Sequence, residues 1–324
     1  MISTLSANSR GVLRAPFHRI AIGIVSLHVL GISLTTQALA AENPESNDDD
    51  HAAGKGSVSL AYQTISVNKF NIGESDVDIG EVLTHSLYVE INYALTDRWQ
   101  ITAGLPFIKK RYDGPGQHDP LTLVPPRPDV PFLDDGSYHS DFQDFFVGFN
   151  YLWRSDPITV EPFVNLFIPS NDYPHFAQAA VGQNLWKLEV GVDLTKYMPF
   201  SYWYYRVETS YTFAEKTLGV SVNHVRLNGE MGYFFTQDFS ANLFVQSKFG
   251  QGGDATDFPP SMRTDERWYQ HDRTSKHNFA NVGIGADWFF ADKYQLYGSA
   301  FTTVWGDTVH LVDLAWSIGI SRYF

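Results

Sequence analysis

Apolar and polar residues alternate along most of this chain, and this period of two restricts the possible folds more than any other feature. In residues 83–95 the odd positions are mainly apolar, for example Leu87, Val89 and Ile91, and the even positions are mainly polar. Successive side chains of a β-strand point to opposite faces of its sheet, so each such segment has one apolar and one polar face. The apolar faces carry almost no charge, which predicts strands that stand between lipid and water.

Twelve segments show this alternation, and each is long enough to cross a membrane as a tilted strand, which takes about nine to eleven residues. The predicted strands are residues 56–67, 81–95, 99–110, 140–153, 158–168, 185–196, 202–213, 220–235, 239–249, 278–290, 294–305 and 312–324. The predicted fold class is therefore all-β, a transmembrane antiparallel up-and-down β-barrel of about 12 strands.

The connections between these strands alternate between tight turns and longer loops. The longer connections are 68–80, 111–139, 169–184 and 250–277, with shorter ones at 214–219 and 306–311. Short periplasmic turns and longer external loops are typical of outer-membrane barrels, and an even number of strands leaves both chain termini on the periplasmic side.

The first forty residues have the pattern of a cleaved signal peptide. Arg10, Arg14 and Arg19 precede an apolar stretch at 20–34, and Ala38-Leu39-Ala40 is a small-x-small cleavage sequence. The apolar stretch is short for a membrane anchor, which needs about 20 residues. We expect secretion to the outer membrane of a Gram-negative bacterium, with a signal peptide at 1–40, a short acidic periplasmic tail at 41–55 and the barrel at 56–324.

Composition excludes several other classes of protein. The formal net charge of −13 argues against a nucleic-acid partner, because phosphates require a basic surface. No segment after residue 40 has eighteen consecutive apolar residues, which excludes membrane-spanning helices, and the absence of cysteine excludes disulfides. A soluble β-sandwich or propeller also alternates, but its exposed face would be charged, whereas His85 and Arg322 are the main ionisable residues on the apolar face here.

The polar face of the predicted barrel carries thirteen ionisable residues. We interpret them as the lining of a pore, whose opposed charges set selectivity. The alternative is a salt-bridge lattice that holds the walls together, and the two interpretations are compatible because a lattice can line a channel. The residues are Glu90, Asp144, Glu161, Lys187, Glu189, Asp193, Arg206, Glu208, Arg226, Glu230, Lys248, Asp287 and Asp313.

Two external loops and the C-terminus suggest further contacts. Residues 111–139 contain six prolines and could fold inward as a constriction, or form a rigid exposed loop. Residues 250–277 mix basic, acidic and histidine side chains that could bind a ligand or a lipopolysaccharide phosphate, or form a solvated charged loop. The final Phe324 resembles the terminal aromatic residue that the barrel-assembly machinery reads. The expected partners are therefore outer-membrane lipids and lipopolysaccharide, this machinery and a small-molecule solute.

A lipid-modifying barrel enzyme is the competing functional class. Such enzymes use a Ser–His pair, typically two residues apart on one strand, but the residue two positions after His224 is Arg226. No histidine of the chain is followed by serine at that spacing. The run His139-Ser140-Asp141 places neighbours on opposite faces of a strand, which is unsuitable for a triad. We therefore expect no catalytic residue, no metal site and no cofactor.

Three short motifs resemble those of the meta-pathway phenol-degradation (MetA) family of outer-membrane channels. Gly104-Leu105-Pro106-Phe107 is similar to its Gly-Leu-Pro-aromatic strand end, and the stretch 140–151 is similar to its Gly-Asp-apolar-x-x-Gly-x-x-Tyr strand. Ile168-Pro169-Ser170-Asn171-Asp172-Tyr173, followed by 181–184, resembles its Pro-Thr-Gly-Asp segment. The resemblance implies a barrel that passes small molecules, often aromatic or apolar, and it supplies no catalytic or binding residue.

The sequence therefore predicts an outer-membrane channel for the passive passage of small solutes, including aromatic or partly apolar compounds. The alternatives are a lipid-modifying barrel enzyme and a closed structural or adhesive barrel.

Overall fold

The computed structural model describes residues 52–72, 75–155, 157–254 and 265–324. The predicted signal peptide and residues 41–51 of the predicted acidic tail lie outside the described residues. Within these ranges no helix is long and apolar enough to cross a membrane. The elements are β1 (Gly56–Ile72), β2 (Ser75–Ala94), β3 (Trp99–Asp113), η1 (Pro120–Thr122), β4 (His139–Phe142), β5 (Phe145–Tyr151), β6 (Trp153–Ser155), β7 (Ile158–Ile168), β8 (Lys187–Tyr197), β9 (Trp203–Ala214), β10 (Lys216–Thr217), β11 (Val220–Ser221), β12 (His224–Phe234), β13 (Phe239–Gly250), α1 (Glu266–Tyr269), α2 (His271–Thr274), β14 (Asn278–Phe290), β15 (Tyr294–Asp307) and β16 (Val309–Tyr323).

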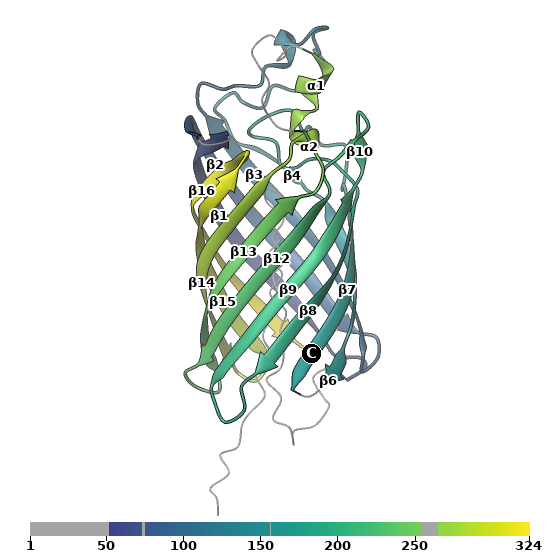
Figure 1. Cartoon of the computed structure of the whole chain (residues 1–324), viewed down its shortest axis with the longest axis vertical. Helices are drawn as coiled ribbons and strands as arrows, with labels where there is room; N and C mark the ends of the chain where they lie inside the picture. The colour runs from purple at the N-terminus through teal and green to yellow at the C-terminus, as the bar shows by residue number, and fades with distance from the viewer. Residues whose placement is uncertain (1–51, 73–74, 156, 255–264) are drawn as a thin grey trace, which may run out of the picture.

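All strand segments except β10 and β11 form one antiparallel sheet that closes on itself (Figure 1). β1 pairs with β2 on one side and with β16 on the other, so that Leu60 lies opposite both Val89 and Ile320. β4, β5 and β6 are consecutive pieces of one interrupted strand between β3 and β7, which makes the ring twelve-stranded. The predicted fold class is confirmed.

The two ends of the barrel differ in the length of their connections. Short turns join the strands at one end, whereas the long connections and both α-helices lie at the other (Figure 1). Gly56 and Phe324 meet at the end with the short turns, where each backbone N–H donates to the carbonyl oxygen of the other at 3.0 and 2.9 Å. We call this the periplasmic end and the opposite one the outer end.

Two predicted loops are strands instead. Residues 68–72 and 75–80 continue β1 and β2, with Lys69 paired to Asp78, and residues 306–311 belong to β15 and β16 except for Thr308. The alternation ends there because the extensions lie beyond the hydrocarbon, where both faces of a strand can be polar. The strand predicted from residue 220 begins at His224, since Leu218 and Gly219, both at positive φ, turn a small β10–β11 hairpin.

The wall of the barrel separates two kinds of side chain. On β2, Ile91 faces outward and is 48% exposed, whereas the neighbouring Glu90 faces inward and is 1% exposed. The outward positions are mainly apolar along the long strands, as contact with lipid requires. The predicted division between a lipid-facing and an inner phase is therefore present in the structure.

Several inner aromatic rings lie across a glycine of the neighbouring strand. Tyr204 of β9 is paired with Gly232 of β12, and Tyr297 of β15 is paired with Gly319 of β16. A Cβ atom added at Gly232 would lie 2.1 Å from the Tyr204 ring, and one at Gly319 would lie 2.3 Å from Tyr297. The missing side chain therefore lets each ring lie against the wall.

Candidate functional site

Twelve of the thirteen predicted lining residues are buried or half-buried on the inner face of the barrel. Lys187 and Glu230 are half-buried, and the other ten of these are buried. Asp313 differs, because the pairing of β16 with β1 shifts register between Val312 and Leu314 and leaves Asp313 exposed in a bulge. The placement of Asp313 with the inner charges was therefore wrong.

The inner charges of β8, β9 and β12 form one connected lattice. Arg206 forms an ion pair with Asp193, and Arg226 lies 2.9 Å from Glu189. Glu208 links the two arginines, because its carboxylate oxygens lie 3.8 Å from a nitrogen of each. These strands are neighbours in the ring, so their inner positions fall at the same height. The lattice anticipated from the sequence is thus a feature of this wall.

Neutral side chains complete the coordination of several carboxylates. Glu189 accepts hydrogen bonds from Asn165 at 3.0 Å and Ser210 at 2.7 Å. Towards the periplasmic end, Tyr204 donates to Glu230 at 2.6 Å, and Gln295 donates to Asp287 at 2.7 Å. Buried charges persist only where such partners satisfy them, so this part of the interior is built as a bonded wall.

The connection between β7 and β8 folds over the outer end of the barrel and forms an inner cap, defined here as residues 169–186. Tyr173 donates a hydrogen bond to Asp144 on the inner wall. Lys110 Nζ donates to the Ala180 carbonyl at 3.1 Å, and Gln143 donates to the Val181 carbonyl at 2.7 Å. Tyr173, Ala179 and Val181 join the apolar cluster inside the barrel. The inner cap, rather than the proline-rich loop alone, therefore narrows the mouth.

The proline-rich loop lies outside the inner cap. Leu121 and Val124 are 61% and 70% exposed, which matches a loop on the surface. Its Asp134 is fully buried, and one of its carboxylate oxygens accepts a hydrogen bond from the Ala179 amide at 2.9 Å. The loop thus contacts the inner cap from outside and is exposed elsewhere, and its role as a constriction stays a prediction.

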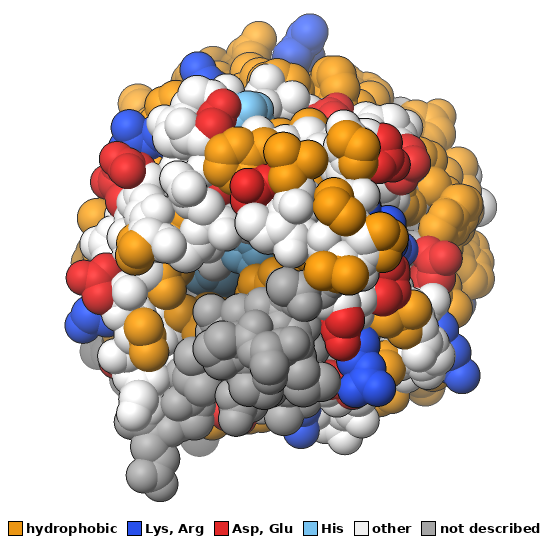
Figure 2. All heavy atoms as spheres, turned by 90° about the horizontal axis from the view of Figure 1, so that it is seen from above, with side chains coloured by type: hydrophobic (Ala, Val, Ile, Leu, Met, Phe, Trp, Pro, Cys, Tyr) orange, Lys and Arg blue, Asp and Glu red, His pale blue; other side chains and the backbone are white. Residues whose placement is uncertain are grey.

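A cavity of about 610 Å³ opens at the outer end between the inner cap, the α2 segment and the barrel wall. Figure 2 shows it from above as a hollow in which histidine side chains are visible. Apolar residues such as Phe70, Ile79 and Val309 line it, together with the cations Lys110 and Lys248. Five histidines also line it, namely His118, His175, His271, His277 and His310.

Apart from Lys248, these cavity residues were not among the predicted lining residues. Lys110 could have been predicted from the sequence, because it continues the inner phase of β3 with Ile108 and Tyr112. The histidines come from separate connections and strand ends, where no periodic pattern gives the direction of a side chain. Only the folded chain brings them together.

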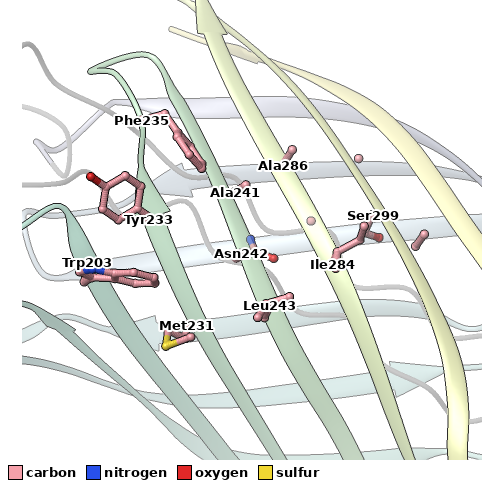
Figure 3. Close-up of a pocket in the computed structure, with 13 residues that line it drawn as sticks. Trp203, Met231, Tyr233, Phe235, Ala241, Asn242, Leu243, Ile284, Ala286 and Ser299 are labelled. Carbon is pink, nitrogen blue, oxygen red and sulfur yellow. The ribbon is translucent and has the colours of Figure 1, made fainter.

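A second hollow, of about 590 Å³, lies on the outer wall near the periplasmic end (Figure 3). Trp203, Tyr233 and Phe235 stand beside small residues such as Ala241 and Ala286. Its lining is almost entirely apolar and lies mainly on the lipid-facing phase, so it matches lipid acyl chains rather than a solute path.

The histidines considered for catalysis do not form a hydrolytic site. His224 is buried, and its Nδ1 lies 3.0 Å from the Val222 carbonyl oxygen. Nε2 of His139 faces both Asp135 at 2.9 Å and the Ser137 hydroxyl at 3.3 Å. A Ser–His–Asp relay needs the serine and the carboxylate on different ring nitrogens, so this arrangement cannot act as one.

No family model matches the chain, and no curated protein matches it in sequence. The resemblance to the MetA family therefore stays an expectation. Among solved structures, the COG4313 outer membrane channel from Pseudomonas putida F1 is similar with a TM-score of 0.64 at 15% identity, and the match covers 86% of this chain and 100% of that chain.

Two further solved structures are similar at lower scores. The KdgM porin in complex with disordered oligogalacturonate has a TM-score of 0.44 at 8% identity, over 82% of this chain and 99% of that chain. The translocator domain of autotransporter NalP from Neisseria meningitidis has a TM-score of 0.47 at 9% identity, over 85% of this chain and 90% of that chain. The fold and the first of these comparisons together show an outer-membrane β-barrel.

Proposed function

We propose that this protein is an outer-membrane channel for the passive passage of small solutes, and that it favours solutes with an apolar or aromatic body and an anionic group. The observation that carries the proposal is the outer cavity, in which apolar side chains surround the cations Lys110 and Lys248. A cavity of about 610 Å³ is in the range that proteins use for small organic molecules.

The charge of the cavity supports an anionic solute. The chain as a whole has a formal net charge of −13, yet Lys110 and Lys248 balance Asp78 and Asp272 in the lining of this cavity. Lys248 is only 5% exposed and forms no ion pair within the described residues, and its charged neighbours are Lys187 and Arg226. A buried cation without a counter-ion attracts an anion that enters the cavity.

Permeability of proteoliposomes tests both parts of the proposal. The purified barrel is reconstituted, and the entry of benzoate, benzamide and benzylamine is compared, since these three share a ring and differ in charge. We expect benzoate to enter fastest and benzylamine slowest. A charge about 8 Å away changes the energy of an ion by ~0.5–2 kcal/mol at an effective dielectric constant of 20–80, so Lys248→Met should slow benzoate about twofold to thirtyfold.

The matched control is Lys69→Met, because Lys69 is exposed on β1 and does not line the cavity. It should leave all three rates unchanged. Equal rates for the three solutes would end the proposal of an anionic preference while leaving a channel. Vesicles that stay sealed with the barrel inserted would end the channel proposal itself.

A closed structural barrel is the second candidate, and the packing of the inner cap favours it. Tyr173, Ala179 and Val181 pack in the same apolar cluster as Ile65, Ile108 and other wall residues. Conductance in planar bilayers separates the candidates, because a sealed barrel gives no current steps, whereas a channel whose cap opens gives them intermittently.

A further inference from the structure

Two histidines from different external loops meet beside the outer cavity. His118 belongs to the proline-rich loop after β3 and His271 begins α2, 153 residues later, yet their Nε2 atoms lie 3.3 Å apart. Both side chains are buried, at 4% and 7% exposure. A carboxylate oxygen of Asp272 lies 3.4 Å from the same Nε2 of His271, and one ligand atom from each of the three residues falls within 4.8 Å of the others.

The second ring nitrogen of each histidine faces an oxygen acceptor. Nδ1 of His118 lies 2.9 Å from Asp134, whose carboxylate also accepts backbone N–H bonds from His118, Gln178 and Ala179. Nδ1 of His271 lies 2.7 Å from the Trp268 carbonyl oxygen. Both Nδ1 atoms must therefore carry a proton, which leaves the lone pair of each neutral ring on Nε2.

Two lone pairs that face each other at 3.3 Å repel unless a cation lies between them. A third proton between the two Nε2 atoms would remove this repulsion, and so would a metal ion bound to both of them. Two nitrogens bound to one tetrahedral Zn²⁺ at ~2.0–2.1 Å lie about 3.3–3.4 Å apart, which matches the observed separation. The rings are within 7° of parallel, and their centroids lie 5.1 Å apart.

The surroundings have the further features of a metal site. A ligating histidine usually donates its other N–H to a carboxylate or a backbone carbonyl, and Asp134 and Trp268 provide these two acceptors. The second oxygen of Asp272 is buried and has no hydrogen-bond partner within the described residues. All three candidate ligands line the cavity, so a fourth coordination position would open towards it.

We propose that His118, His271 and Asp272 bind a divalent transition-metal ion of the zinc class, and that this ion fastens the proline-rich loop to the α2 segment across the mouth of the barrel. Two imidazoles and one carboxylate suit zinc better than the oxygen-seeking magnesium or calcium. Asp134 and Trp268 act as positioning groups that hold the two rings with Nε2 towards the ion. The site does not depend on the solute proposed above.

Titration of the purified barrel with Zn²⁺ in detergent tests this site, with calorimetry for affinity and Co²⁺ absorption for coordination. We expect one saturable site per chain and the intense visible bands of four-coordinate Co²⁺. His118→Gln with His271→Gln should abolish both signals. Asp134→Asn should weaken Zn²⁺ binding about 10–100-fold, because it removes the acceptor that orients His118.

The matched control is His139→Gln, since His139 lies on β4, pairs with Asp135 and is absent from the cavity. It should keep both signals, and circular dichroism confirms that every variant is a folded barrel. Hydrogen exchange adds a readout that does not depend on transport activity. Zn²⁺ should slow amide exchange in both the proline-rich loop and the α2 segment. The proposal would be overturned if the folded wild type showed no saturable Zn²⁺ binding, or if the double variant bound Zn²⁺ equally well. A proton shared between the two rings would then explain their close contact.

Discussion

Replacing Arg226 by methionine should destabilise the barrel strongly. The Arg226 and Glu189 side chains are 4% and 2% exposed at a separation of 2.9 Å, and Glu208 lies 3.8 Å from the same guanidinium group. Methionine removes the cation and leaves the buried carboxylates of Glu189 and Glu208 without it, although Glu208 keeps its contact at 3.8 Å with Arg206. Breaking a buried ion pair from one side costs about 3–5 kcal/mol of unfolding free energy.

Urea unfolding of the barrel in phospholipid vesicles, followed by tryptophan fluorescence, measures this loss. The control is Arg111→Met, whose pair with Glu81 has side-chain exposures of 29% and 44% and should contribute less than about 1 kcal/mol. Adding Glu189→Gln to Arg226→Met should recover at least ~1 kcal/mol, since it removes one unpaired charge. If Arg226→Met lost no more stability than Arg111→Met, water would screen the inner charges, and the lattice would be the lining of a wide aqueous pore.

Two further predictions concern the inner wall and the inner cap. Gly232→Ala should destabilise the barrel by about 1–3 kcal/mol in the same urea assay because its Cβ would overlap the Tyr204 ring, whereas Gly229→Ala on the same strand meets nothing within 4 Å and should cost little. Burial, followed by the nearby Arg273, lowers the pKa of His175 to about 4, although Asp272, Asp172 and Gln270 act in the opposite direction. When the cap is open, His175 has an ordinary pKa near 6.5, so it is protonated at a higher pH than in the closed cap. The closed cap should therefore lose stability as pH falls from about 6.5 to 4. Relative to the intrinsic exchange rate at each pH, amide protection at 173–184 should fall over that window and not in His175→Gln; the same loss of protection in the variant would remove His175 as the cause.

The outer wall was predictable because lipid constrains nearly every second residue of a spanning strand. This is why the twelve strands and the inner phase of Glu189, Arg206 and Arg226 followed from alternation alone. Asp313 was misplaced because a bulge shifts the phase, and no residue pattern marks that bulge. The ends of β1 and β2 beyond the membrane were mistaken for a loop for the related reason that water on both faces removes the alternation.

The outer mouth could not be predicted in the same way. Loop positions follow from contacts between distant segments, such as Lys110 with Ala180 and His118 with His271. The sequence suggested no metal site because its histidines have no regular spacing, and the pairing of His118 with His271 exists only after the barrel has closed. The role of the inner charges as pore lining stays a prediction.

The rings that lie across glycines determine how far the inner wall reaches into the barrel. Tyr204 and Tyr297 occupy space that a Cβ atom on the next strand would otherwise fill, so their thickness is absorbed by the wall. A bulkier residue at Gly232 or Gly319 would push the facing tyrosine ring towards the barrel axis. A smaller residue in place of the tyrosine would leave a recess in the inner wall. The free cross-section can therefore change one strand pair at a time, while the number of strands and their register remain the same.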